Sequence, residues 1–165
     1  MSIQDSGNRR EFETGAVRDI AEGKGRCDLL PLDVIADGIG DEVLMRINDF
    51  IRFGGEDAIW RAIESFNADV YPTGVVTLLL EVSKHYEDGC TKYGERNWEQ
   101  GIPLHCYIDS GVRHYLKFRR GDTDERHDRA FLWNMFGALW TLRHKPEMND
   151  LPFADNADKG LDISF

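Results

Sequence analysis

Two acidic residues near the start of a long apolar segment are the first candidates for chemistry. Asp124 and Asp128 fall on the same stripe as Phe131 and Met135 when residues 123–144 are placed on a helix. Two carboxylates that enter a buried face are costly unless a cation meets them. Two interpretations carry about equal weight: a divalent-metal site, or neutralisation by nearby lysine or arginine. Removing either charge is expected to raise the stability of the metal-free protein.

A third acidic residue, Glu87, lies on the helix expected over residues 73–93. On a wheel of about 100° per residue, the apolar side of this helix points roughly 140–165° away from Glu81 and Asp88. Glu87 lies about 100° from that side, at one flank, and His85 lies at the other. Glu87 is therefore the only one of the three acids expected to border the interior.

Positive charge collects on the helix expected over residues 103–120. Arg113, Lys117 and Arg120 form a ridge away from its apolar face, and His114 lies at the flank. Such a ridge can bind phosphate, because guanidinium and ammonium groups donate hydrogen bonds to phosphate oxygens. Taken alone, however, the ridge is more typical of a solvated face.

Several other residues have ordinary explanations when they are taken singly. The tryptophans Trp98, Trp133 and Trp140 are more typical of a core than of platforms that stack on a base. His127 alone is more often a hydrogen-bonded polar residue than a ligand. The segment GKGR at 23–26 lacks the spacing of a phosphate-binding P-loop and carries little weight.

Composition indicates one globular domain and excludes several classes of protein. The chain has 165 residues, of which 41% are hydrophobic and 30% are charged. No apolar run approaches the roughly 20 residues of a membrane span, and the polar N-terminus predicts no secretory signal. The net charge of −10 argues against binding to a nucleic-acid polymer, which needs a cationic footprint. Three cysteines without a CxxC motif fit a reducing cytosol.

The elements that must position these residues are helices. Apolar residues recur at helical spacing, and no segment shows strand-like alternation of useful length. Asp41 is a good N-cap, and Gly94 and Gly121 are expected stops. A short helix is expected between Pro31 and the break at Gly38. The other helices are expected at 41–53, 56–66, 73–93, 103–120 and 123–144.

The expected fold class is all-α, a helical bundle built on the last three long helices. Residues 1–30 form an irregular N-terminal arm in this interpretation. The helical domain covers residues 31–145. Residues 146–165 form an acidic and mostly irregular tail.

Three stretches together carry a more specific pattern. They are GAVRDIAEGKGRCDLLP at 15–31, HYEDGCTKYGERNWEQGIPL at 85–104 and YIDSGVRHYLKFRRGDTDERHDRAFLWN at 107–134. The set resembles the phage-encoded dATP/dGTP diphosphohydrolases, which are relatives of the MazG-like all-α NTP pyrophosphatases. Members include the MazZ enzymes of phages that replace adenine with 2-aminoadenine. Residues 33–72 look like an insertion relative to this pattern.

The resemblance implies what the protein does and how it assembles. It implies Mg²⁺-dependent hydrolysis of dGTP, dATP or both, to the deoxynucleoside monophosphate and pyrophosphate. It implies helical subunits that pair as a homodimer or homotetramer, in the host cytoplasm of a phage-infected bacterium. Carried over by position, it implies a nucleotide site of eight residues: Lys92, Tyr93, Asn97, Trp98, Arg113, His114, His127 and Asn134.

The catalytic residues expected to hold Mg²⁺ are Glu87, Asp124 and Asp128, and Mn²⁺ can substitute for the ion. A metal-activated water would attack the α-phosphorus. The general MazG-type signature has an ExxE pair on one helix and an ExxD pair on the next. Lys84 stands three residues before Glu87, so the first pair is broken, whereas Glu125 and Asp128 form a literal ExxD.

The remaining site residues are assigned to the triphosphate and the base. Lys92, Arg113 and Lys117 are expected to neutralise the departing pyrophosphate. Base recognition is assigned to Tyr93 or Trp98 by stacking, and to Asn97 or Asn134 by hydrogen bonding. The alternative function is a nucleotide sponge, which sequesters a signalling nucleotide in the same pocket without cutting it. The broken ExxE pair favours that alternative.

Overall fold

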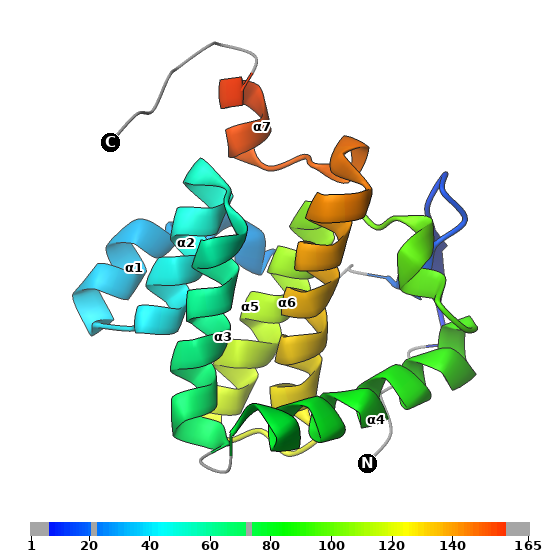
Figure 1. The fold of residues 1–165 in the computed structure, drawn as a ribbon, viewed down its shortest axis with the longest axis horizontal. Helices are drawn as coiled ribbons and strands as arrows, with labels where there is room; N and C mark the ends of the chain where they lie inside the picture. The colour runs from blue at the N-terminus through cyan, green and yellow to red at the C-terminus, as the bar shows by residue number, and fades with distance from the viewer. Residues whose placement is uncertain (1–6, 21–22, 72–73, 158–165) are drawn as a thin grey trace.

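Two long helices, α5 (Leu104–Arg120) and α6 (His127–His144), form the centre of the fold. They lie side by side and antiparallel, joined by a short turn, and make the most extensive helix contact of the chain (Figure 1). The computed structural model describes residues 7–20, 23–71 and 74–157. In this part of the chain the fold is all-α apart from one small hairpin, so the predicted fold class is confirmed.

The other helices lie on two sides of this central pair. On one side, α3 (Glu56–Val70) packs against α6 and against α2 (Glu42–Phe53), and α2 contacts α1 (Leu32–Ile39). On the other side, α4 (Val75–Tyr93) runs across α6, as Figure 1 shows. Short 3-10 turns lie at η1 (Cys27–Leu29), η2 (Asn97–Gln100) and η3 (Pro146–Met148).

Local capping chemistry sets three of the predicted helix boundaries, and these are confirmed. The carboxylate of Asp41 accepts a hydrogen bond from the backbone N of Leu44 at 3.0 Å and so caps α2. Gly94 ends α4, and Gly121 ends α5 in the left-handed conformation with φ of 85°. Residue 73, the predicted first residue of α4, lies outside the described residues.

The predicted start of the last helix is wrong. Helix α6 begins at His127 rather than at residue 123, so Asp124 precedes the helix and does not share a helical stripe with Asp128. Side-chain ion pairs hold the turn in its non-helical form. Asp124 bonds to Lys117 at 3.0 Å, and Asp122 pairs with Arg120. Lys117 and Arg120 belong to the end of α5, and a helical wheel of residues 123–144 does not include them.

The arm predicted to be irregular contains a β-hairpin. Strands β1 (Arg9–Glu11) and β2 (Val17–Asp19) pair antiparallel, with Arg10 opposite Arg18. Gly15 makes the turn possible with φ of 84°, and a side chain there would collide with Gln100. Strands of three residues are too short to show alternation in the sequence, which is why the hairpin was not predicted.

The core explains how closely the central helices approach. Gly137 on α6 lies against the ring of Tyr107, and an added Cβ would overlap that ring. Gly111 on α5 faces the Met135 side chain in the same way. Phe66 of α3 packs against Phe131 of α6, and the two ring centroids are 4.7 Å apart. These contacts fix the position of α5 relative to α6, and with it the side chains that the two helices carry.

Part of the predicted irregular tail is ordered on the bundle. Helix α7 (Pro152–Ala157) follows η3, and Phe153 lies with its ring centroid 5.6 Å from that of Phe50. Leu151 is buried. Residues 158–165 of the predicted tail lie outside the described residues. Among the helices that the structure describes, none has the length and apolar character to cross a membrane.

Candidate functional site

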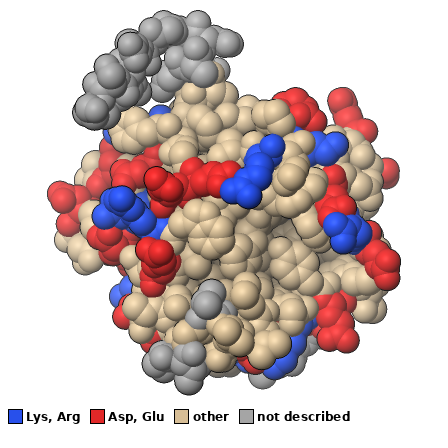
Figure 2. All heavy atoms as spheres, in the orientation of Figure 1, with Lys and Arg blue, Asp and Glu red and all other residues tan. Residues whose placement is uncertain are grey.

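A cavity of about 560 Å³ lies between the hairpin, α4, α5 and the start of α6. Three carboxylates line it, Asp19, Asp109 and Glu125, against six lysine and arginine side chains. Acidic side chains are spread over the face drawn in Figure 2, with basic ones among them, as expected for a net charge of −10. The charge inside the cavity is therefore opposite to that of the whole chain. Its cations are Arg10, Arg18, Lys24, Arg26, Arg113 and Lys117.

Strand β2 delivers Arg18 into this cavity in a fixed orientation. Its guanidinium carbon lies 5.3 Å from the ring centroid of Tyr107 and 5.4 Å from that of Trp133. Its Nη2 donates a hydrogen bond of 3.0 Å to Oδ1 of Asn134. Its buried Nη1 has no hydrogen-bond partner among the described residues. The arrangement presents a positioned donor that an anion could use.

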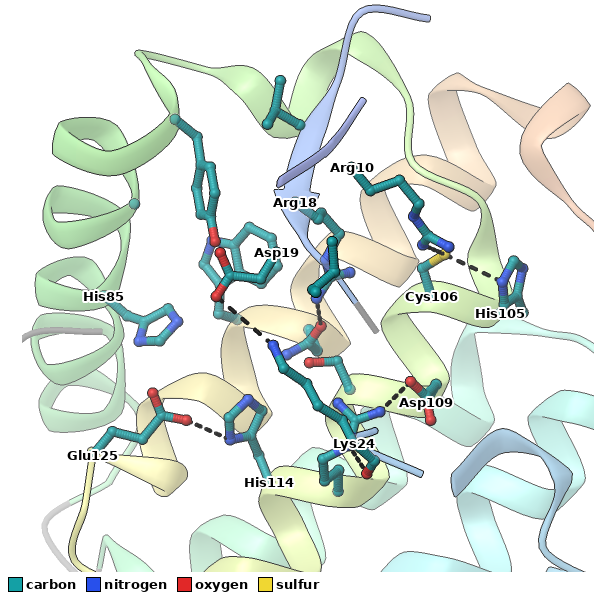
Figure 3. Close-up of a pocket in the computed structure, with 18 of the residues that line it drawn as sticks. Arg10, Arg18, Asp19, Lys24, His85, His105, Cys106, Asp109, His114 and Glu125 are labelled. Atoms are coloured by element: carbon teal, nitrogen blue, oxygen red, sulfur yellow. Dashed lines mark hydrogen bonds and ion pairs between the residues drawn. The ribbon is translucent and has the colours of Figure 1, made fainter. Parts of the chain in front are cut away.

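A second group of cations lies at the junction of β1 and α5 (Figure 3). Arg10 donates from Nη2 to Sγ of Cys106 at 2.9 Å, and Nε2 of His105 lies 3.3 Å from the same sulfur. His105 also pairs with Asp150 through Nδ1. The hydrogen bond to Asp150 raises the pKa of His105 from 6.5 to about 10, with a further contribution from Cys106. At neutral pH this imidazole is therefore a cation.

The stretch between the hairpin and η1 is attached to α5 by Arg113. Its guanidinium pairs with Asp109 and donates to the backbone oxygens of Lys24 and Gly25 at 3.1 and 3.2 Å. Oδ1 of Asp109 accepts from the backbone N of Cys27 at 2.6 Å. Burial lowers the pKa of Lys24, although Asp19 opposes that shift. The GKGR segment, which carried little weight as a motif, thus contributes Lys24 to the cavity.

A cluster of histidines and carboxylates forms the other end of the cavity. Oε1 of Glu125 lies 3.0 Å from Nδ1 of His114 and 3.4 Å from Nδ1 of His127. The two Nδ1 atoms are 3.0 Å apart. Nε2 of His127 lies 2.7 Å from Oδ1 of Asp124. Hydrogen bonds from Lys117 and then His127 hold the pKa of Asp124 well below its usual range, whereas burial lowers the pKa of His114.

Most of the residues predicted to bind substrate reach the cavity. Three do not line it: Lys92 pairs with Asp19 at 2.9 Å, Trp98 packs edge-to-face on Trp140, and His127 lies behind His114. Six line it: Tyr93, Asn97, Arg113, His114, Lys117 and Asn134.

The two asparagines are already engaged with other parts of the chain. Asn97 is 5% exposed, and its amide accepts from the backbone N of Val17 at 2.8 Å and donates to the Val17 oxygen at 2.9 Å. Asn134 accepts from Arg18 and donates to the backbone oxygen of Ala130. Asn97 therefore holds β2 in place, and Asn134 orients Arg18. Neither amide is poised to read a base.

The three predicted metal ligands do not share a site. Glu87 is exposed and does not line the cavity. Asp128 is 5% exposed and bonds to Arg126 at 2.6 and 2.9 Å and to the hydroxyl of Tyr71 at 2.5 Å. Burial acts to raise the pKa of Asp128, but these hydrogen bonds lower it below its usual value. Asp124 lies at the histidine cluster instead. The set therefore does not fit a single Mg²⁺ ion.

One expectation behind that set is wrong, and for Asp128 the alternative of neutralisation by an arginine holds. The helical wheel counts Val76, Leu79 and Leu80 toward the apolar side of α4, but these side chains are exposed. The face of α4 toward the cavity therefore carries His85 rather than Glu87. The charge of Asp128 is compensated by Arg126, so its removal is not expected to stabilise the protein.

The structure adds cavity residues that the sequence did not single out. Arg18 and Lys24 lie within the stretch 15–31 that carried part of the family resemblance, which was the available signal. Glu125 was visible only as half of an ExxD pair. His85 and Asp109 lie in the other two stretches of that resemblance, 85–104 and 107–134, but carried no assigned role. Nothing local in the sequence pointed to Arg10, His105 or Cys106.

Comparison with known proteins places the sequence of this chain in a family. A family model described as dATP/dGTP diphosphohydrolase, N-terminal, matches residues 66–151. That span runs from the end of α3 through α4, α5 and α6 to η3, and so includes the histidine cluster and Arg113. The hairpin lies outside it. No curated protein and no solved structure shows a significant match to the chain.

Proposed function

This chain belongs to the dATP/dGTP diphosphohydrolase family, and on that premise we propose that its cation-lined cavity binds dGTP, dATP or both and releases the monophosphate and pyrophosphate. The observation that supports the proposal best is the local reversal of charge. A chain of net charge −10 gathers six lysine and arginine side chains around one cavity. Such a concentration of donors suits a polyanion of the size of a triphosphate.

Arg18 and Arg113 are the residues assigned to the phosphates. Arg18 has a buried Nη1 that lacks a partner within the described part of the chain, and its guanidinium lies against the rings of Trp133 and Tyr107. Arg113 lies on α5 and is oriented by Asp109. Guanidinium groups fixed in this way stabilise the charge that develops on a departing pyrophosphate without reorganising during the reaction.

Tyr93 is the residue assigned to the base. It lines the cavity, whereas Trp98 is packed between Tyr86 and Trp140. A ring of this size suits a purine and tolerates a pyrimidine, so base preference would come from polar groups at the base edge. Asn97 and Asn134 are engaged elsewhere, so other cavity residues would supply those groups.

Mg²⁺ remains part of the proposal as an ion carried by the substrate. Triphosphates bring their own Mg²⁺, which usually keeps several waters and contacts few protein carboxylates. Mn²⁺ would substitute in that role. The carboxylates predicted to hold a resident ion, Glu87, Asp124 and Asp128, lie in three different environments. We therefore assign no step to a resident Mg²⁺.

The nucleotide sponge remains the alternative function. The separation of the predicted carboxylates favours it, because a cavity that binds triphosphates without a catalytic group would sequester them. The test is a turnover screen over the eight common NTPs and dNTPs with Mg²⁺ or Mn²⁺, with resolved products. Pyrophosphate from dGTP or dATP supports the enzyme. Tight binding without product supports the sponge, and orthophosphate contradicts both.

We also propose a homodimer or homotetramer that acts in the cytoplasm of a phage-infected bacterium. Helix α4 exposes Val76, Leu79 and Leu80, which a second copy could cover. The three cysteines are free, as a reducing compartment would keep them. Light scattering at micromolar concentration tests the assembly, and a monomer would contradict it.

A further inference from the structure

His114, Glu125 and His127 form a cluster at the end of the cavity where α5 meets the start of α6, which we call the helical end. This cluster has the spacing of a metal site. Three donor atoms face one another: Nδ1 of His114, Nδ1 of His127 and Oε1 of Glu125. We propose that they bind one divalent transition-metal ion of the zinc class, and that this site does not select Mg²⁺. The inference needs no nucleotide and stands apart from the proposed reaction.

The distances between the donors support this assignment. The three donor-to-donor distances are 3.0, 3.0 and 3.4 Å. An ion bound about 2.1 Å from each donor separates neighbouring donors by about 3.0–3.4 Å in octahedral or tetrahedral geometry. The three distances therefore match those between ligand atoms that share one ion.

A carboxylate behind the cluster supplies an independent argument. Asp124 lies 2.7 Å from Nε2 of His127 and is itself held by Lys117 at 3.0 Å. When His127 donates its Nε2–H to Asp124, the neutral ring presents the Nδ1 lone pair to Glu125 and His114. Histidines that ligate metals usually donate their other ring N–H to a carboxylate in this way. Asp124 is thus a positioning residue rather than a ligand.

The position of the cluster leaves room for exchangeable ligands. His127 is 2% exposed and closes the back of the site, whereas His114 and Glu125 line the cavity. Figure 3 shows His114 and Glu125 pointing toward each other, with His85 nearby on α4. An ion there would be held from one side by protein, and its open positions would face the cavity.

The chemistry of the donors decides which ion fits. Two imidazole nitrogens and one carboxylate suit Zn²⁺ and its neighbours, because Mg²⁺ prefers oxygen ligands. A second cluster, Asp122, Asp124 and His127, has more oxygen donors. Its two carboxylates are already paired with Arg120 and Lys117. The more buried group of His114, Glu125 and His127 is therefore the better site.

The test is metal binding by the full chain after treatment with a chelator. Equilibrium dialysis with ZnCl₂ is expected to give one ion per chain, retained against an excess of Mg²⁺ of about 100-fold. Co²⁺ is expected to give visible d–d bands without a thiolate charge-transfer band. Displacement of Zn²⁺ by Mg²⁺, or a thiolate band that assigns binding to a cysteine, would overturn the proposal.

Substitutions at the proposed ligands test where the ion binds. Glu125→Gln and His114→Ala are expected to weaken Zn²⁺ binding at least 100-fold, and Asp124→Asn about 10- to 100-fold. Glu64→Gln and His144→Ala, which change exposed residues outside the cluster, are the matched controls and should bind as the parent does. Circular dichroism checks the fold, and the isosteric Glu125→Gln carries the test if His114→Ala unfolds. Unchanged Zn²⁺ binding by folded Glu125→Gln would overturn the assignment.

Discussion

The two ends of the cavity are built in opposite ways. At the arm end, Arg18 reaches across the chain to Asn134 on α6 and leaves a buried nitrogen without a partner inside the described residues. At the helical end, His114, Glu125 and His127 lie close in the sequence and contact one another. The arm end thus keeps a positioned donor for an incoming anion. The helical end is a closed set, which suits an ion that its members share.

Among the predictions that compare the two ends of the cavity, the replacement of Arg18 has the largest expected effect on nucleotide binding. Arg18→Ala is expected to weaken dGTP or dATP binding about 10- to 100-fold, because hydrogen bonds to charged groups contribute about 1.5–3 kcal/mol. Zn²⁺ binding should stay unchanged. Isothermal titration with each ligand measures both, and Arg52→Ala, on the exposed side of α2, is the control. Equal losses of the two ligands would show that the ends are not independent.

A second prediction concerns an acid that belongs to neither end. Asp128→Asn is expected to lower the free energy of unfolding by about 1–3 kcal/mol, because it weakens the hydrogen bonds of Arg126 and Tyr71. Urea titration measures the loss, with the exposed Asp37→Asn as the control. Zn²⁺ binding by the folded variant should equal that of the parent. A stabilised variant would restore the view that this charge is uncompensated.

A third prediction tests whether the arm end depends on the docking of β2. Asn97→Ala removes two hydrogen bonds to Val17, each contributing about 0.5–1.5 kcal/mol. Hydrogen exchange in β2 is expected to accelerate, and nucleotide binding to weaken several-fold. The ratio of dGTP to dATP affinity should not change. Asn48→Ala on α2 is the control. A changed base preference would instead assign Asn97 to the base.

A fourth prediction concerns a pH dependence at the arm end. The pKa of His105 is 6.5 as an ordinary histidine and about 10 in the folded protein. Its stabilisation is therefore fully present below about pH 6.5 and is lost as pH rises toward 10. The melting temperature should fall across that window, and less steeply in His105→Gln than in His144→Gln. Identical slopes would show that Asp150 does not stabilise the imidazolium.

The helices were predictable because their signals are local. Asp41 caps α2 by accepting a hydrogen bond from the backbone N of the residue three positions later, and Gly94 and Gly121 end their helices through backbone conformation. The start of α6 was not predictable in the same way, since Lys117 and Arg120 hold the preceding turn from another helix.

The site was less predictable because its residues act through distant partners. Asn97 lines the cavity, yet its amide bonds to Val17, eighty positions earlier in the chain. His114 and His127 were predicted as nucleotide-site residues, but their meeting with Glu125 depends on the turn between α5 and α6. Residue type and spacing identified where chemistry could occur, whereas the role of each side chain depended on packing.

The two hydrogen bonds between Asn97 and the backbone of Val17 attach the hairpin to the helical body, and the position of Arg18 depends on that attachment. For a hairpin that opens, the observed dissociation constant of a ligand held by Arg18 equals the intrinsic constant divided by the fraction of molecules with the hairpin docked. The dependence is reciprocal. A nucleotide that bridges Arg18 and Arg113 raises the docking equilibrium by the same factor by which docking raises its affinity.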